Sequence, residues 1–284
     1  MPLHDRTALP LGFLGTVVLL GLLPITLMAG ENSVAADIVA PLRDAIYAQT
    51  LDERSLRELH RDTLERITQN IQSLQESAHA RALAHYYLGR YYQALESPTI
   101  MAAYADDLRH GRYLSLRGYY TRRKQAMEAY RMACQESEIV LDMTDDAEAH
   151  RLHGEILGQM LFLGTIGDLF AIGTRAKDEV DKALSLAPNA TKILIQEASR
   201  MAYSPDGFGG DRDGARELYR QALRNSDGDQ EDFFNIYCGF AMAAFMEKND
   251  DEALGWFIEA STLYPQNVFA QGMILYLENN KETS

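Results

Sequence analysis

Apolar residues recur at helical spacing along almost the whole chain beyond residue 37. In the stretch "TKILIQEASRMAY", for example, Ile193, Leu194, Ala198, Met201 and Ala202 fall on one face when the chain is wound at 3.6 residues per turn. Proline is sparse, and no run of alternating β-branched residues is present. The pattern predicts an all-α protein with helices over 37–48, 53–76, 78–96, 120–142, 146–163, 168–186, 190–203, 212–224, 231–247, 250–263 and 267–279.

The N-terminal segment has a different pattern, because Thr7 to Gly30 is a run of 24 residues without a charge. Two interpretations remain open. The run is either a signal peptide that is cleaved near Val34-Ala35-Ala36, or an uncleaved anchor long enough to span a bilayer. Both predict a targeting segment over 1–36 and a helical domain over 37–284. Both also predict an extracytoplasmic location, as a periplasmic, secreted or inner-membrane-anchored protein.

The glycine-rich stretch "DGFGGDRDGARELYRQAL", residues 206 to 223, resembles a phosphate-binding loop at first sight. The dinucleotide pattern G-x-G-x-x-G fails, since Arg212 stands where the third glycine is needed. The P-loop pattern also fails, because Ala215 and Arg216 replace its lysine and hydroxyl residues. The preceding segment is helical, so this stretch is predicted to be an enlarged turn between two helices.

The clearest internal pattern lies near the C-terminus, in "NIYCGFAMAAFMEKNDDEALGWFIEASTLYPQN". Small and aromatic residues stand at fixed places on two successive helices: Tyr237, Phe240, Ala241 and Ala244 on the first, and Ala253, Phe257, Ala260 and Pro265 on the second. This unit, 234–267, resembles a tetratricopeptide repeat, in which small side chains allow close helix approach and large ones fill the gap.

Related signatures recur upstream in this sequence. Second-helix signatures occur at Ala126, Tyr130 and Ala133, at Ala176, Val180 and Ala183, and at Ala215, Tyr219 and Ala222; a first-helix signature occurs at Leu88, Gly89 and Tyr92. The resemblance implies a right-handed α-solenoid of antiparallel helix pairs with enlarged inter-helix loops. "LFLGTIGDLFAIG" before "DKALSLAPNA", and a Gly-Gly-Asp turn before "GARELYRQAL", are similar to the TatT-like proteins associated with periplasmic TRAP transporters. That resemblance implies an accessory role beside a solute-binding subunit.

Repeat geometry also indicates a binding face. In such arrays, first-helix residues that do not pack within the pair line the concave surface. The predicted groove residues are Lys192, Ile195, Ser199, Tyr203, Asn235, Met242, Phe245 and Met246. The groove is mostly apolar, and two interpretations remain open: an open groove for a partner, or packing of these residues against neighbouring helices such as 267–279.

The charge of the chain argues against one class of function and indicates one candidate binding surface. A formal net charge of −14 argues against a general nucleic-acid-binding protein, which needs cations to neutralise phosphates. Residues 109–125 nevertheless concentrate a basic patch formed by Arg109, Arg112, Arg117, Arg122, Arg123 and Lys124. It predicts either a site for an anion or an acidic partner, or a solvated insertion neutralised by the protein's own carboxylates.

Chemistry-bearing motifs are few. His150, His153 and Glu155 in "HRLHGE" lack the H-E-x-x-H pattern. The stretch "NSDGDQED" (225–232) lacks the spacing of a calcium loop and is predicted to be a polar turn between helices with an N-capping aspartate. No metal site or cofactor is therefore predicted. Cys134 and Cys238 could form at most one disulfide. The sequence therefore predicts a non-enzymatic interaction scaffold. The alternative is a carrier that holds a small apolar or anionic ligand in a cavity lined by Tyr203, Met242 and Phe245.

Overall fold

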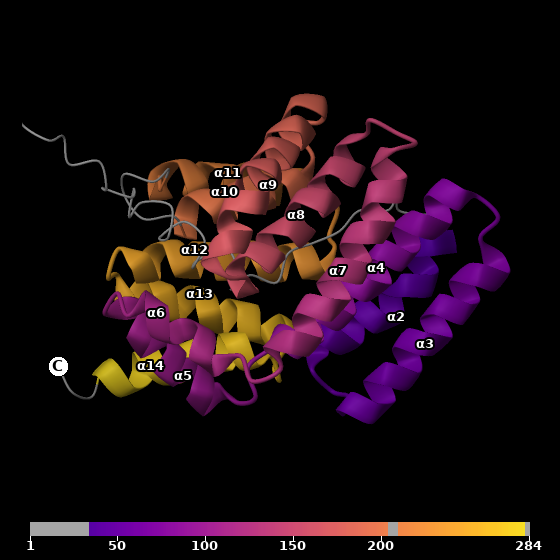
Figure 1. Cartoon of the computed structure of the whole chain (residues 1–284). Coiled ribbons are helices and arrows are strands. Elements are labelled where there is room, and N and C mark those ends of the chain that lie inside the picture. The colour runs from indigo at the N-terminus through magenta and orange to yellow at the C-terminus, as the bar shows by residue number, and fades with distance from the viewer. Residues whose placement is uncertain (1–33, 204–209, 282–284) are drawn as a thin grey trace, which may run out of the picture.

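The computed structural model describes residues 34–203 and 210–281, and all regular secondary structure in these ranges is helical. The all-α prediction is therefore confirmed (Figure 1). The helices are α2 (Val34–Ala48), α3 (Glu53–Asn70), α4 (Leu74–Gln93), α5 (Pro98–Arg109), α6 (Tyr113–Leu116), the 3-10 turn η1 (Arg117–Tyr119), α7 (Arg123–Leu141), α8 (Ala147–Leu163), α9 (Ile166–Leu186), α10 (Thr191–Tyr203), α11 (Arg212–Asn225), α12 (Gln230–Met246), α13 (Asp250–Leu263) and α14 (Val268–Lys281).

Two helix predictions near the N-terminal end were wrong. The break between α3 and α4 lies at 71–73 rather than at 77, because Ser73 caps α4 by accepting a hydrogen bond from the Glu76 amide. Helix α5 lies in a stretch that was not predicted to be helical. Its start signal is Ser97 followed by Pro98: the serine side chain accepts from the Ile100 amide, and proline occupies the first turn, where no amide donor is needed.

Most helices pack in pairs. Helix α4 packs against α7, α8 against α9, α10 against α11, and α12 against α13. The pairs are joined to one another through contacts of α7 with α8, α10 with α12, and α13 with α14, while α2 lies on α4. The apolar faces of most of these helices merge into one large core that extends from Ala35 to Leu277. A smaller cluster of Leu157, Leu161 and Ala176 lies between α8 and α9.

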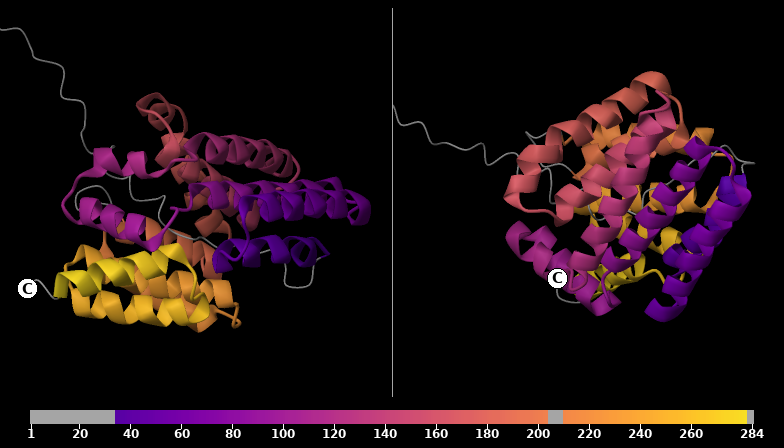
Figure 2. Two further views of the ribbon diagram at one scale, coloured as in Figure 1. Left: turned by 90° about the horizontal axis from the view of Figure 1, so that it is seen from below. Right: turned by 45° about the vertical axis from the view of Figure 1, so that its right-hand side comes forward.

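Helix α14 takes its partner from far away in the sequence, since it packs against α5. Figure 2 shows the C-terminal helix α14 beside α5. Helix α5 belongs to the segment that connects α4 to α7 in the sequence, and this segment extends across to α14. A segment from the first half of the chain and the C-terminal helix are therefore brought together, and many side chains of α4, α8, α10 and α12 are buried.

Glycines permit the closest of these helix contacts. A Cβ atom at Gly89 of α4 would lie 2.5 Å from the Tyr130 ring of α7, and one at Gly239 of α12 would lie 2.1 Å from the Tyr219 ring of α11. Both tyrosines are fully buried, so their rings could not move aside without repacking the core.

Several sequence predictions fall at or beyond the edge of the described ranges. The uncharged run Thr7 to Gly30 lies outside them, and none of the described helices is long and apolar enough to span a bilayer. Residues 204–209 of the glycine-rich stretch also lie outside. The following helix α11 begins at an N-cap, Asp211, whose carboxylate accepts from the Gly214 amide. Cys134 and Cys238 are both free thiols.

Candidate ligand site inside the helical array

Polar side chains gather on the covered inward faces of four helices. We call this set the internal polar cluster; its members are Tyr86, Tyr87, Arg90 and Gln93 on α4, Arg151, Glu155 and Gln159 on α8, Lys192, Gln196, Ser199 and Tyr203 on α10, and Glu231, Asp232 and Asn235 on α12. All except Arg90, which is partly exposed, are buried. Burying polar groups costs free energy unless they are hydrogen-bonded. Such a concentration therefore needs polar contacts to stabilise it.

Some of these polar side chains are hydrogen-bonded to one another. The buried Glu155 carboxylate accepts hydrogen bonds from Gln159 Nε2 at 2.7 Å and from the Tyr86 hydroxyl at 3.3 Å. Burial raises the pKa of Glu155, and these two donors oppose that rise. The Tyr130 hydroxyl donates to Gln93 Oε1 on the facing helix. These bonds link α4, α7 and α8 around the centre of the molecule.

Arg90 is one of three cations in the cluster, together with Arg151 and Lys192. Burial lowers its pKa, but neighbouring tyrosine hydroxyls and the Glu155 carboxylate outweigh this and raise the pKa above its ordinary value, so the guanidinium is charged. Its Nη1 atom is buried and has no hydrogen-bond partner among the described residues. The hydroxyl of Tyr87, about one turn earlier on α4, is also buried and has no hydrogen-bond partner among the described residues. Two unused donors thus stand together on one helix face.

Arg90 and Tyr87 line a cavity of about 70 Å³. Apolar side chains supply part of the remaining wall: Ile46, Leu95, Met101, Val268 and Phe269. Polar side chains supply another part: Tyr47, Gln49, Gln93, Tyr120 and Asn267. The wall combines residues from α2, α4, the α5 segment and the start of α14, so the cavity lies where the two ends of the array meet. A charged donor and a hydroxyl beside an apolar wall are suited to a ligand that has an anionic end and an apolar body.

An acidic pair occupies the first turn of α12, at another edge of the cluster. Burial raises the pKa of Glu231 to about 7 and that of Asp232 to about 6, although Lys192 partly opposes both shifts. Arg43 Nε lies 3.5 Å from Glu231 Oε2, and Lys192 Nζ lies 3.8 Å from Asp232 Oδ1. These carboxyl groups change charge near neutral pH, which Glu and Asp ordinarily do not.

The predicted groove residues lie mostly in the interior. Lys192, Ile195, Ser199 and Tyr203 on α10, and Asn235, Met242 and Phe245 on α12, are buried, whereas Met246 is partly exposed. Phe245 packs edge-on against Tyr276 of α14, and the Arg109 guanidinium lies 4.0 Å above its ring. These side chains therefore do not form an open groove, because all but Met246 are buried. A role in binding a ligand inside the array stays a prediction.

The arginines of the predicted basic patch mostly contact the protein itself. Arg109 pairs with Asp250 at 2.6 Å, and Arg112 pairs with Asp106 and Asp107. Arg122 donates to main-chain carbonyls at the end of α4 and lies 4.6 Å above the Tyr91 ring, and Arg123 donates to the Leu163 carbonyl. Arg117 is partly buried, and Lys124 is exposed. These contacts fix the 98–125 segment in place, while a binding role for the patch stays a prediction.

The residues of "HRLHGE" do not converge on one site, and the acidic stretch 225–232 lies between α11 and α12. His150 contacts Glu179 and Asp145, His153 lies between α7 and α8, and Glu155 belongs to the internal polar cluster. In the 225–232 stretch, Asp229 caps α12 by accepting from the Glu231 amide at 2.8 Å. The interpretation of this stretch as a capped turn between helices is confirmed.

Sequence reasoning did not identify Tyr87 and Arg90. Both stand in "HYYLGRYYQAL", where Leu88, Gly89 and Tyr92 were recognised for packing. An arginine among four tyrosines on one helix was the available signal. No protein-family model matches this chain, and a search of the curated proteins finds no match.

Proposed function

We propose that this chain is a non-catalytic binding protein that holds a small carboxylate-bearing ligand inside its helical array. One observation carries the proposal. The buried Nη1 atom of Arg90 has no hydrogen-bond partner among the described residues, and Arg90 lines a cavity whose wall also contains apolar side chains. A guanidinium presents its N–H donors in a plane that matches a carboxylate, and such charge-assisted bonds are stronger than neutral ones.

The size of the cavity supports a particular ligand class. About 70 Å³ accommodates a group of a few heavy atoms, which is the size of a carboxylate and the carbons next to it. The hydroxyl of Tyr87 can donate a second hydrogen bond, while Met101 and Phe269 offer apolar contact. The carboxylate of a short aliphatic or aromatic monocarboxylate can accept hydrogen bonds from Arg90 and Tyr87, while its apolar part contacts the apolar side chains of the wall.

The wider setting is also a proposal. We infer a solenoid of tetratricopeptide-like pairs over 37–284 whose ends are joined through α5 and α14, with residues 1–36 directing export. Beside a periplasmic solute-binding subunit, an internal carboxylate site would give an accessory protein its own contact with the transported solute.

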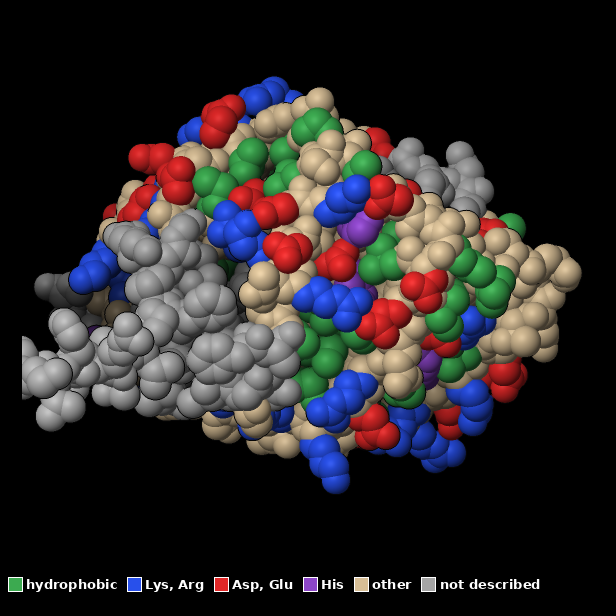
Figure 3. Space-filling view, turned by 45° about the horizontal axis from the view of Figure 1, so that its top comes forward, with side chains coloured by type: hydrophobic (Ala, Val, Ile, Leu, Met, Phe, Trp, Pro, Cys, Tyr) green, Lys and Arg blue, Asp and Glu red, His purple; other side chains and the backbone are tan. Residues whose placement is uncertain are grey.

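A second candidate function is an interaction scaffold without a ligand. The contacts of Gly89 with Tyr130 and of Gly239 with Tyr219 favour it, because small and large residues opposed in this way are typical of repeat pairs that bind proteins. Acidic and basic side chains are interspersed over the face seen in Figure 3, so a partner on that face would be recognised through polar contacts.

One purification separates the two candidates. The full chain is isolated under mild conditions, one half is denatured and extracted for organic acids, and the other half is analysed by mass spectrometry for bound proteins. A stoichiometric carboxylate supports the ligand carrier. A transport or solute-binding protein without any small molecule supports the accessory scaffold and counts against the internal site.

A further inference from the structure

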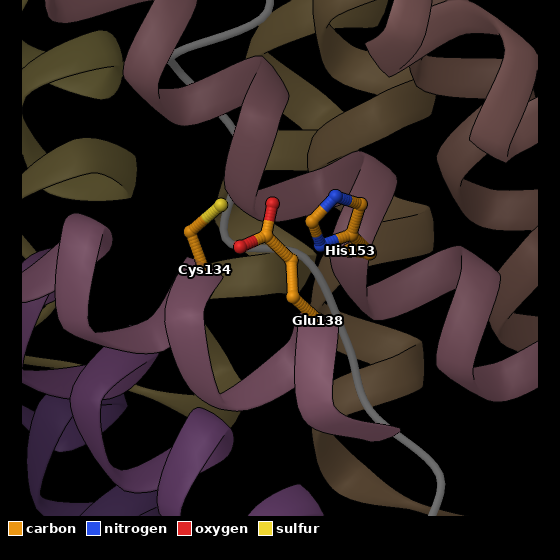
Figure 4. A group of neighbouring side chains, drawn as sticks. All are labelled: Cys134, Glu138 and His153. Carbon is orange, nitrogen blue, oxygen red and sulfur yellow. The ribbon is translucent and has the colours of Figure 1, made fainter. Parts of the chain in front are cut away.

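A cluster separate from the internal cavity lies between α7 and α8. Cys134 and Glu138 stand four residues apart on one face of α7, and His153 faces them from α8. The Cys134 sulfur, a Glu138 carboxylate oxygen and a His153 ring nitrogen all lie within 4.8 Å of one another. In Figure 4 the three side chains point toward a common centre. Each group is an established kind of metal ligand.

The hydrogen bonds of Ser137 determine which nitrogen of His153 carries the proton. The Ser137 hydroxyl donates its hydrogen to the Cys134 carbonyl at 2.9 Å. In the 2.8 Å contact between Ser137 Oγ and His153 Nδ1, the hydrogen therefore comes from Nδ1. Nε2 is left with a lone pair, and it is buried without a hydrogen-bond partner among the described residues.

This arrangement has the form of a metal-binding histidine. Such histidines usually donate their second ring N–H to an acceptor, which fixes the tautomer and the ring orientation. Ser137 provides that acceptor here.

We propose that Cys134, Glu138 and His153 form a binding site for a divalent transition metal ion, with Zn²⁺ as the best fit. Sulfur, nitrogen and carboxylate oxygen donors together suit zinc, whereas Mg²⁺ and Ca²⁺ require oxygen ligands. Three protein ligands leave the fourth tetrahedral position to water or to another small ligand. The site joins α7 to α8 and shares none of its three ligands with the internal polar cluster.

One existing contact must change when the metal binds. Glu138 Oε1 pairs with Arg175 Nη1 at 2.9 Å, and both side chains are nearly half exposed. Exposed pairs of this kind contribute little to stability. Zinc bonds of about 2.0 to 2.3 Å require the donors to draw closer than they stand now. The partly exposed Glu138 side chain is the group free to make that movement.

The test is a Co²⁺ and Zn²⁺ titration of the metal-free full chain, because tetrahedral Co²⁺ bound to a thiolate absorbs in the visible and near-ultraviolet. We expect one Co²⁺ per chain, a sulfur-to-cobalt charge-transfer band, and displacement of Co²⁺ by Zn²⁺. Cys134→Ser should abolish the band. Cys238→Ser is the matched control, since that thiol is buried in α12 and is not part of the cluster.

Two further variants test the remaining ligands. Ser137→Ala should lower metal affinity by about 10 to 100-fold, as the loss of a group that orients a metal-binding histidine does. Glu138→Gln should weaken binding at least tenfold; its position is partly exposed, so the variant should fold even if His153→Gln does not. Circular dichroism of each variant confirms folding.

Two results would overturn the site. The first is the absence of a thiolate band in the folded wild-type chain at saturating Co²⁺. The second is metal binding that Cys134→Ser and Glu138→Gln leave unchanged, which would assign the ion to surface carboxylates or to another histidine.

Discussion

Gly272 of α14 lies so close to Met101 of α5 that a Cβ atom at position 272 would stand 2.3 Å from the Met101 Cβ atom. The Pro98 carbonyl would lie 2.8 Å away, so rotation of the methionine side chain alone could not relieve the contact. This contact joins the last helix of the chain to a helix inserted between α4 and α7. It is the point at which the helical array closes.

Gly272→Ala should therefore destabilise the protein. The added methyl group overlaps main-chain and Cβ atoms, and overpacking of this kind typically costs about 1 to 3 kcal/mol. Gly255→Ala on α13 is the control, because a Cβ atom there meets nothing within 4 Å. Alanine favours a helix over glycine by roughly 1 kcal/mol, so this variant should gain stability. Urea denaturation measures both, and equal effects would show that the α5–α14 contact is not tight.

Arg109 is expected to stabilise the same closure from the other side. It pairs with Asp250 of α13 and lies above Phe245 of α12. Arg109→Gln should lower the free energy of unfolding by about 1 to 3 kcal/mol, through loss of a charge-assisted hydrogen bond and a cation–π contact. The exposed pair of Arg220 with Glu217 provides the comparison, and Arg220→Gln should change stability by less than about 0.5 kcal/mol. A loss no greater for Arg109→Gln would contradict its proposed role.

The raised pKa of Glu231 predicts that stability falls as the pH rises. The folded state holds this proton up to about pH 7, whereas the unfolded chain releases it near 4.5. Between these values the folded state binds more protons, so the free energy of unfolding decreases with pH, by on the order of 3 kcal/mol from this group. Asp232, with its pKa raised to about 6, adds a slope of the same sign at lower pH.

Denaturation at pH 5, 6, 7 and 8 measures this slope. Glu231→Gln should flatten it between about pH 5 and 7, because the variant has no charge to bury, and should be the more stable protein at pH 8. Glu65→Gln, at an exposed position on α3, should keep the slope of the wild type. Parallel curves for wild type and Glu231→Gln would show that Glu231 does not titrate in this range.

The sequence predicted the helices well where local signals were strong. The aspartate cap before α12 and the turn before α13 were readable, and so was the pairing pattern of small and aromatic residues. Helix α5 was missed because its polar face and its basic flank resembled a loop. Its start signal, Ser97 followed by Pro98, was not recognised.

The candidate site could not be found in the same way. Tyr87 and Arg90 carry no recognisable motif, and their significance depends on α5 and α14 closing over them. That closure is a contact between residues about 170 positions apart, such as Met101 and Gly272. The cluster of Cys134, Glu138 and His153 was not predicted for a similar reason. His153 was compared with His150 and Glu155 on its own helix, whereas the other two members of the cluster come from α7.

The most direct test of the central claim is calorimetric titration of the full chain with a series of short monocarboxylates, comparing wild type with Arg90→Gln and Tyr87→Phe. We predict binding of one ligand per chain, a loss of at least tenfold in affinity for Arg90→Gln, and a smaller loss for Tyr87→Phe. Arg54→Gln, on the exposed face of α3, should bind like the wild type. Equal affinities in the wild type and the folded Arg90→Gln variant, or no binding across the series, would contradict an internal carboxylate site.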